Sequence, residues 1–276
     1  MSEWRAAYRI GDSALALWGA SPALEAWAAS LYPCARSGDR ADAARAFYLA
    51  GQQGAYGLWE EGEQIAEAAT QSAFFIELEW RMTRALMEGL DRRYQLHAGV
   101  VARSGGALVL CGASGAGKTS LCVALGLRGA AVYSDEVAAF DMDTLRIDPF
   151  PRDLIVHAGT QSLFPELASL DVPPWKCFAD RKHLPPRGWC AQAEGPVPCR
   201  ALLFPRLQAG GPPVLRRLGQ AEAAQRVLEQ SFSVAQWEQR AIDAVAALVE
   251  HHPAWELVFA DARGAADVLW DSEITW

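Results

Sequence analysis

The octapeptide GASGAGKT at residues 112–119 constrains this chain more than any other feature of its sequence. It fits the pattern Gly-x4-Gly-Lys-Thr of a phosphate-binding loop, in which glycines let backbone N–H groups surround an anion without Cβ clashes. An apolar run at residues 107–111 reads as a strand before the loop, and residues 118–127 read as a helix closed by Gly129. This context is the one the motif requires, so the sequence predicts a phosphate site.

We expect the loop and the first helical turn to hold the phosphates of ATP or GTP. Lys118 would neutralise charge on the terminal phosphates, and the Thr119 hydroxyl would bind Mg²⁺. Lys118 is one of only three lysines in the chain, which favours a real phosphate-binding motif over a chance match. The predicted nucleotide-binding residues are Gly112, Ala113, Ser114, Gly115, Ala116, Gly117, Lys118, Thr119 and Ser120.

Two carboxylates, Asp135 and Glu136, follow a short apolar run at residues 130–133. We expect this run to be a strand parallel to the loop's strand and beside it, which would bring both carboxylates to the phosphates. One would bind Mg²⁺, and the other would accept the proton of an attacking hydroxyl. The alternative is a solvated pair at a strand end. The short spacing from Lys118 argues against a motor or transport ATPase.

His97 begins the predicted strand at residues 97–102, which precedes the loop's own strand. A histidine in such a place is, taken alone, more often a hydrogen-bonded core residue than a catalytic one. His97 becomes a candidate catalytic residue only when it is considered together with the motifs around it in the sequence.

Residues 96–141 contain Leu96-His97, the Gly105-Gly106 turn, the phosphate-binding loop, Arg128-Gly129 and Ser134-Asp135-Glu136. This combination resembles the catalytic domain of HPr kinase/phosphorylase, a bacterial serine kinase related to PEP carboxykinase. The resemblance implies an α/β fold with a P-loop kinase core of that type, a mixed sheet with flanking helices. It implies Mg-ATP as phosphoryl donor and a serine of a peptide or small protein as acceptor.

The resemblance also implies roles for individual residues. Asp135 matches the family's proton acceptor, Glu136 stands with Thr119 at the metal, and His97 matches a histidine near the transferred phosphate. Lys118, Asp135 and His97 are therefore the predicted catalytic residues. Glu136 replaces an aspartate of the family pattern, which keeps the charge and lengthens the reach to the metal.

Outside this stretch the chain departs from the family. The glycine-rich second signature of the bifunctional enzymes is not visible near residues 148–152, and residues 1–95 do not resemble their regulatory domain. We therefore expect no phosphorylase activity and a substrate other than HPr. The chain is more similar to the divergent HPr-kinase-like proteins associated with peptide modification, which include kinases of lasso peptide precursors.

Two regions follow from this reading. Residues 1–95 form a small α+β region, with a hairpin at residues 6–10 and 13–18 and a helix at 71–90. Residues 96–276 form the catalytic domain, in which residues 148–200 are a loop-rich lobe and 234–249 a single helix. Family members assemble into rings, which leaves a homo-oligomer open.

The composition of the chain excludes some classes of binding partner. The net charge of −8 disfavours nucleic acid and anionic membranes. No run approaches the ~18–20 apolar residues of a membrane span, and no signal peptide is recognisable, so we expect a cytoplasmic protein.

Several alternatives stay open at this stage. The acceptor could be a small molecule, or the protein could bind ATP without catalysis and act as a maturation partner. Cys177, His183, Cys190 and Cys199 could bind zinc, although their spacing fits no standard knuckle. The basic residues of the loop-rich lobe could contact phosphate or acceptor, or could be ordinary surface charge. These are Arg152, Lys176, Arg181 and Lys182.

Overall fold

The computed structural model describes residues 4–30, 32, 36–37, 43, 45–52, 54–232, 234–272 and 274. It is an α/β protein with mixed sheets and flanking helices. None of the helices in the described part is long and apolar enough to cross a membrane. The chain divides into two compact units. The first contains Met1–Asp91, Pro151–Ala158 and Ser169–Pro185, and the second contains Arg92–Phe150, Gly159–Ala168 and Pro186–Trp276. Two segments expected in the catalytic domain, Pro151–Ala158 and Ser169–Pro185, thus belong to the first unit.

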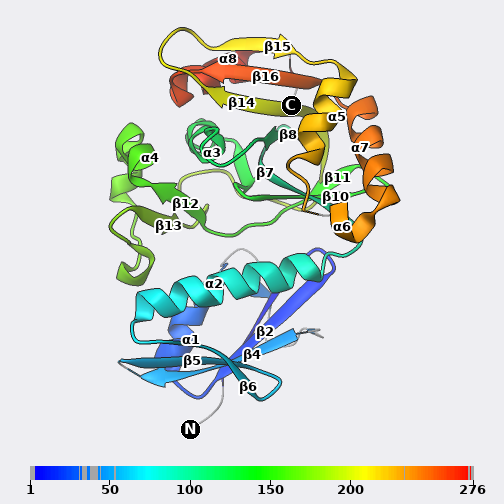
Figure 1. The fold of residues 1–276 in the computed structure, drawn as a ribbon. Coiled ribbons are helices and arrows are strands. Elements are labelled where there is room, and N and C mark those ends of the chain that lie inside the picture. Colours follow the sequence, from blue (N-terminus) through cyan, green and yellow to red (C-terminus); the bar gives the residue numbers. More distant parts are fainter. Residues whose placement is uncertain are drawn as a thin grey trace. The chain divides into compact units, whose positions relative to one another are not determined.

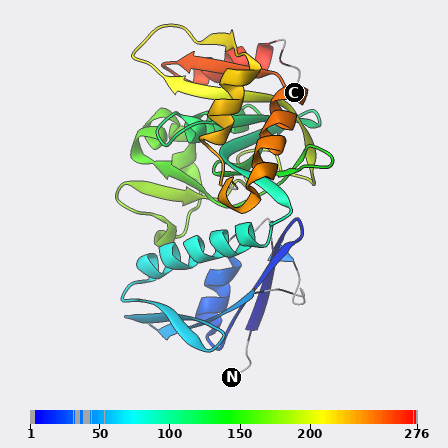
Figure 2. The same ribbon diagram turned by 45° about the vertical axis from the view of Figure 1, so that its right-hand side comes forward.

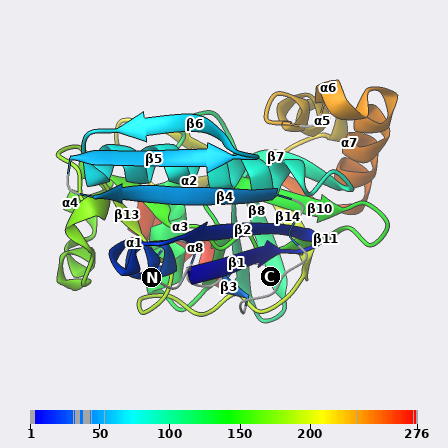
Figure 3. The same cartoon turned by 90° about the horizontal axis from the view of Figure 1, so that it is seen from below.

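The first unit is built on a six-stranded sheet, within the described residues, with the order β3-β1-β2-β4-β5-β6 (Figures 1 and 3). All neighbours are antiparallel except β2 and β4. The predicted hairpin is confirmed as β1 and β2, joined by a turn with Gly11 at φ +52°. The strands are β1 (Trp4–Ile10), β2 (Ser13–Gly19), β3 (Arg36–Ser37), β4 (Arg45–Gln52), β5 (Ala55–Glu60) and β6 (Glu63–Ala68).

Helices α1 (Pro22–Ala29) and α2 (Gln71–Glu88) cover one face of this sheet. Strand side chains alternate between faces, and on the helix side they are apolar and buried, as at Leu17, Leu49 and Leu58. The helices add aromatic side chains, with Trp27 stacked on Phe74 at 5.4 Å between ring centroids. The unit therefore has a core of its own.

The later segments of the first unit add β12 (Leu154–His157), β13 (Arg181–Leu184) and the short 3-10 helix η2 (Pro174–Lys176). The two strands form an antiparallel pair.

The second unit is built on a mixed sheet with the order β11-β10-β7-β8-β14-β16-β15, in which β9 also pairs with β7 (Figures 1 and 2). Strands β8, β14 and β16 are parallel, and β7 is antiparallel to β8. The strands are β7 (Arg93–Arg103), β8 (Gly106–Cys111), β9 (Ala131–Ser134), β10 (Val137–Asp141), β11 (Arg146–Asp148), β14 (Val197–Leu207), β15 (Val214–Arg217) and β16 (Ala254–Phe259).

Helices cover both faces of this sheet. α3 (Lys118–Leu127) and α8 (Ala262–Asp271) lie together on one face, and α5 (Gln220–Leu228) and α7 (Gln239–His251) lie on the other. Every residue of β8 is buried, which is why its sequence reads as a continuous apolar run. Residues Gly159–Ala168 also belong to this unit. They contain nearly all of α4 (Ala158–Leu163) and of the 3-10 helix η1 (Pro165–Ser169).

Two expectations about local structure are wrong. The predicted helix at 234–249 is two helices, α6 (Val234–Trp237) and α7, because Glu238 adopts a left-handed φ of +50° between them. Strand β9 is not beside the loop's strand β8. Both are antiparallel to β7, so they run in the same direction, but β7 lies between them.

Candidate functional site

The predicted phosphate-binding loop connects the end of β8 to the start of α3, as the motif requires. Gly117, the residue before the helix, has a left-handed φ of +95°, and a Cβ there would lie 2.7 Å from Phe259 Cζ. Gly115 is also left-handed, at φ +82°. The loop tip, Ala113 to Gly115, is exposed. A helix start has N–H groups without intrahelical acceptors, so this geometry suits an anion.

Lys118 is turned back toward the loop and is only 6% exposed. Its ammonium group donates to the carbonyl oxygens of Gly112 at 2.5 Å and Ala113 at 3.1 Å. Burial lowers the pKa of Lys118, while Glu136 and Asp135 act in the opposite direction. Two neutral carbonyl oxygens thus hold the ammonium group of Lys118 beside the loop. A phosphate oxygen in their place would bind the ammonium group more strongly, because it carries a negative charge.

Asp135 and Glu136 lie where the chain passes from β9 to β10 along one edge of β7. The Ser134 hydroxyl accepts hydrogen bonds from the N–H groups of Glu136 and Val137, at 3.1 and 2.9 Å. This side-chain turn interrupts the strand between β9 and β10. Asp135 is 3% exposed, and its Oδ2 accepts a hydrogen bond of 3.1 Å from the Thr119 hydroxyl. The turn therefore delivers a carboxylate to the first turn of α3.

His97 occupies the centre of the site because β7 pairs on both edges. On one edge Ala98 is opposite Cys111, which brings His97 level with the start of the loop; on the other edge His97 is opposite Val137. Its Nε2 lies 2.9 Å from the Lys118 Nζ, and its Nδ1 lies 3.1 Å from the Glu136 Oε1. One imidazole thus links the lysine to the acidic pair.

The residues present fit a nucleotide and a magnesium ion. With both carboxylates ionised, Asp135 and Glu136 outweigh the charge of Lys118, so a cation would be favoured. In the described part of the chain no three His, Cys, Asp or Glu side chains gather to hold a metal. Mg²⁺ does not need such a cage, because it usually takes one or two carboxylates and completes its shell with phosphates and water. Thr119 and Asp135 are adjacent and could supply two oxygens.

The structure brings together all the predicted catalytic and metal-binding residues: His97, Lys118, Thr119, Asp135 and Glu136. It differs in one detail, because the contact of Thr119 is with Asp135, whereas Glu136 contacts His97.

Sequence reasoning missed two neighbours of the site. Phe232, 46% exposed, packs edge-on against His97 with ring centroids 5.7 Å apart. Its N–H donates to Gln95 O, and this bond holds the preceding segment against β7. Thr160 of α4 shares a hydrogen bond of 2.9 Å with Ser120. No local pattern marks either residue, since both reach the site through tertiary contacts.

The loop-rich lobe does not supply free basic side chains at Arg152 and Lys176, which are 5% and 1% exposed. Lys176 pairs with Asp153 at 2.5 Å and donates to Ser30 O, and Arg152 lies 3.6 Å from Glu79. All these residues belong to the first unit. Arg152 and Lys176 are therefore paired inside the first unit.

The remaining residues of the lobe are placed as follows. Arg181 pairs with Asp180, and Lys182 lies on β13 opposite Val156. His183 is buried between Phe75 and Phe178, and Cys199 is buried on β14. The described residues thus give no support to the zinc alternative.

Comparison of the chain with models of known protein families gives no match. Comparison with curated proteins gives none either.

Proposed function

We propose that this protein is a Mg-ATP-dependent kinase that transfers the γ-phosphoryl group to a hydroxyl, the serine of a peptide or small protein. The observation that carries the proposal is the junction of Lys118, His97 and the two carboxylates beside the phosphate-binding loop. The HPr-kinase-like core, ATP and Mg²⁺ are parts of this proposal. They rest on the resemblance of residues 96–141 and on the fit of the site.

In this mechanism the loop and the N-terminal turn of α3 bind the phosphates, and Lys118 exchanges its carbonyl partners for phosphate oxygens. Bound Mg²⁺ would neutralise phosphate charge. Thr119 and the acidic pair would hold it. Asp135 orients the acceptor hydroxyl and accepts its proton. His97 fixes the position of the lysine and links it to Glu136. Positioning and charge stabilisation supply most of the rate in such transfers.

Because Asp135 contacts Thr119, its carboxylate could also be a ligand of the metal ion, in addition to accepting the proton. The two roles predict different effects of Mg²⁺ concentration on an Asp135 variant. Loss of a base lowers the transfer rate at every Mg²⁺ concentration, whereas loss of a metal ligand is relieved when Mg²⁺ is raised.

The test is incubation with γ-labelled ATP and each peptide or small protein encoded beside the gene. Label on serine supports the proposal, and Asp135→Asn should lower its rate by about 10²–10⁴ while nucleotide still binds. The matched control is Asp143→Asn, an exposed aspartate in the β10–β11 turn.

Other results point elsewhere. A normal transfer rate in Asp135→Asn would refute the base assignment. Transfer to an added small-molecule alcohol, with none to any of these peptides or proteins, would favour a small-molecule kinase. Tight ATP binding without transfer to any acceptor would favour a maturation partner gated by nucleotide.

A further inference from the structure

The face of the first unit's sheet opposite α1 and α2 carries a row of aromatic side chains. Trp18, Tyr48 and Trp59 are direct cross-strand neighbours on β2, β4 and β5. Their ring centroids are 4.4 Å apart from Trp18 to Tyr48 and 5.7 Å apart from Tyr48 to Trp59. We call these three residues the aromatic ladder. All three are half-buried, although none of the helices that the structure describes in this unit packs on this face.

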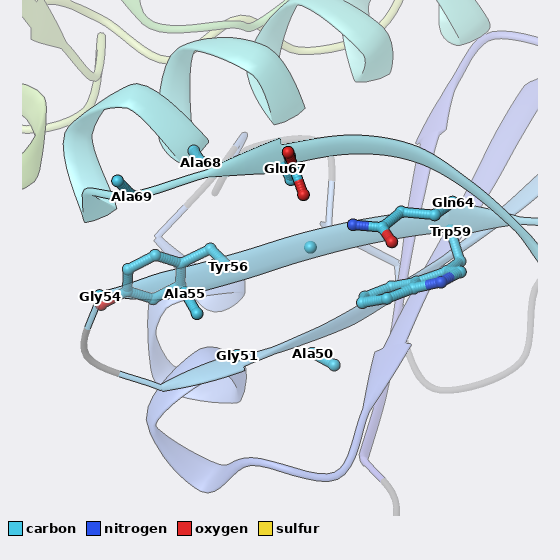
Figure 4. Close-up of a pocket in the computed structure, with 11 residues that line it drawn as sticks. Ala50, Gly51, Gly54, Ala55, Tyr56, Trp59, Gln64, Glu67, Ala68 and Ala69 are labelled. Atoms are coloured by element: carbon cyan, nitrogen blue, oxygen red, sulfur yellow. The ribbon is translucent and has the colours of Figure 1, made fainter.

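Small residues on both sides of the ladder leave hollows. The first, of about 480 Å³, has Ala50 and Gly57 in its lining, and Figure 4 shows Trp59 and Gln64 at one end and Tyr56 at the other. A Cβ at Gly57 would lie 2.3 Å from the Trp59 ring, so only glycine lets this ring lie over the strand. The second hollow, of about 490 Å³, is lined by all three ladder residues.

The β5–β6 hairpin at the edge of this sheet is acidic. Residues 55–69 contain four glutamates and no lysine or arginine. Glu60 is paired with Arg45 at 2.6 Å. The other three, Glu61, Glu63 and Glu67, form no ion pair with any residue that the structure describes. Glu67 lines the first hollow and Glu61 the second. Each hollow therefore has in its lining a carboxylate without an ion pair among the described residues. The second hollow is also lined by Arg45, whose charge is paired with Glu60 and Glu88.

We infer that this face binds an extended peptide segment in which lysine or arginine side chains and apolar side chains point to the same side. The apolar side chains would fill the hollows, and the cations would meet Glu61 and Glu67 and the faces of the aromatic rings. Complementary charge on an apolar floor gives such a surface both affinity and selectivity. Anionic peptides would be repelled.

Two other modes of binding fit less well. A peptide strand added along the free edge of β6 would need its backbone carbonyls, but Arg81 already donates to Ile65 O at 2.8 Å. A flat polysaccharide would need coplanar rings, but neighbouring rings of the ladder are tilted by 48° and 55°.

This inference does not rest on the proposed kinase activity, because the first unit alone supplies every residue involved. Lys118→Met, which should abolish transfer, is expected to leave this binding unchanged. Failure of one proposal is thereby distinguishable from failure of the other.

The experiment uses the full chain and a short fluorescein-labelled peptide of repeated Lys-Ser-Val-Ser units, which in an extended conformation presents lysine and valine on one side, read by fluorescence anisotropy. The matched probe has glutamate in place of lysine. Glu61→Gln and Glu67→Gln remove charge with little change of shape, and Tyr48→Thr opens the ladder with a residue that favours strands. Glu25→Gln, on an exposed position of α1, is the control.

We expect the lysine peptide to bind with a dissociation constant on the order of micromolar, weakening as salt rises. Each glutamate variant should weaken it by about three- to tenfold, the double variant and Tyr48→Thr by about tenfold or more, and Glu25→Gln not at all. Equal binding of both probes, no binding, or binding unchanged in the variants would overturn the inference. So would binding of a labelled glucan, or a dimer in sedimentation that Tyr48→Thr dissociates.

Discussion

The Lys118 ammonium group lies 2.9 Å from His97 Nε2, and the other nitrogen of that imidazole lies 3.1 Å from Glu136. The lysine comes from the loop after β8, the histidine from β7 and the glutamate from the turn after β9. One imidazole ring thus links the lysine of the predicted phosphate-binding loop to a glutamate from a different segment of the chain.

This coupling predicts that His97 positions Lys118. His97→Asn should lower the affinity for Mg-ATP by roughly tenfold, measured by calorimetry, because the lysine loses one of its three contacts. In a double-mutant cycle, His97→Asn and Glu136→Gln should be non-additive. His251→Gln, an exposed histidine at the end of α7, is the control. Unchanged affinity in His97→Asn would show that the two backbone carbonyls suffice to hold the lysine.

Burial lowers the pKa of Lys118, so the protonation of this lysine should be linked to nucleotide binding. Well below its pKa in the free protein, Lys118 is already charged and no proton moves. As pH rises through that pKa, the free lysine loses its proton and bound phosphate restores it. We expect proton uptake and falling affinity at alkaline pH, measured by calorimetry in buffers of different ionisation enthalpy.

Lys118→Arg is the control for that experiment, because a guanidinium stays protonated. The arginine variant should show no uptake. Equal uptake in both proteins would assign the proton to another group.

Gly117 is predicted to be required for packing as well as for backbone conformation. Gly117→Ala should cost roughly 1–2 kcal/mol for its left-handed φ and a further ~1–3 kcal/mol for the collision with Phe259. Gly129→Ala, at φ +104° with open space around it, carries only the first cost. Urea unfolding measures both. Adding Phe259→Leu should recover part of the loss, and equal destabilisation by the two alanines would contradict the packing argument.

His183 should make the first unit sensitive to acid. Burial is the main cause that lowers its pKa from 6.5 to about 4, and neither ring nitrogen has a hydrogen-bond partner in the described part of the chain. Since the unfolded chain binds the proton more readily, the stabilisation is present above about pH 6.5 and is lost as pH falls toward about 4. The full loss is roughly 3 kcal/mol.

The measurement is the free energy of unfolding in urea near neutral pH and near about pH 5. His183→Phe, which keeps a ring between Phe75 and Phe178, should reduce the acid-induced loss. His157→Gln, an exposed histidine on β12, should leave it unchanged. A loss as large in His183→Phe as in the parent protein would assign it to other groups.

Local patterns in the sequence identified most elements, because burial repeats with the period of a strand or helix. The hairpin at the start of the chain, the helix α2 and the strand–loop–helix around Lys118 are all present. The break at Glu238 was not visible, because the apolar period continues across it. The place of β9 was not visible either, because strand order is set by pairing between distant segments.

The candidate site shows the same division. The sequence by itself determined a glycine-rich loop with one lysine and one threonine, and an acidic pair at the end of a strand, since these depend on residue type and short spacing. Only the tertiary structure decided that β7 lies between the loop and the acidic pair, which brings His97 against Lys118 and Glu136. It also decided that Arg152 and Lys176 are buried. Their partners, Glu79 and Asp153, are fixed by packing that spacing along the chain does not encode.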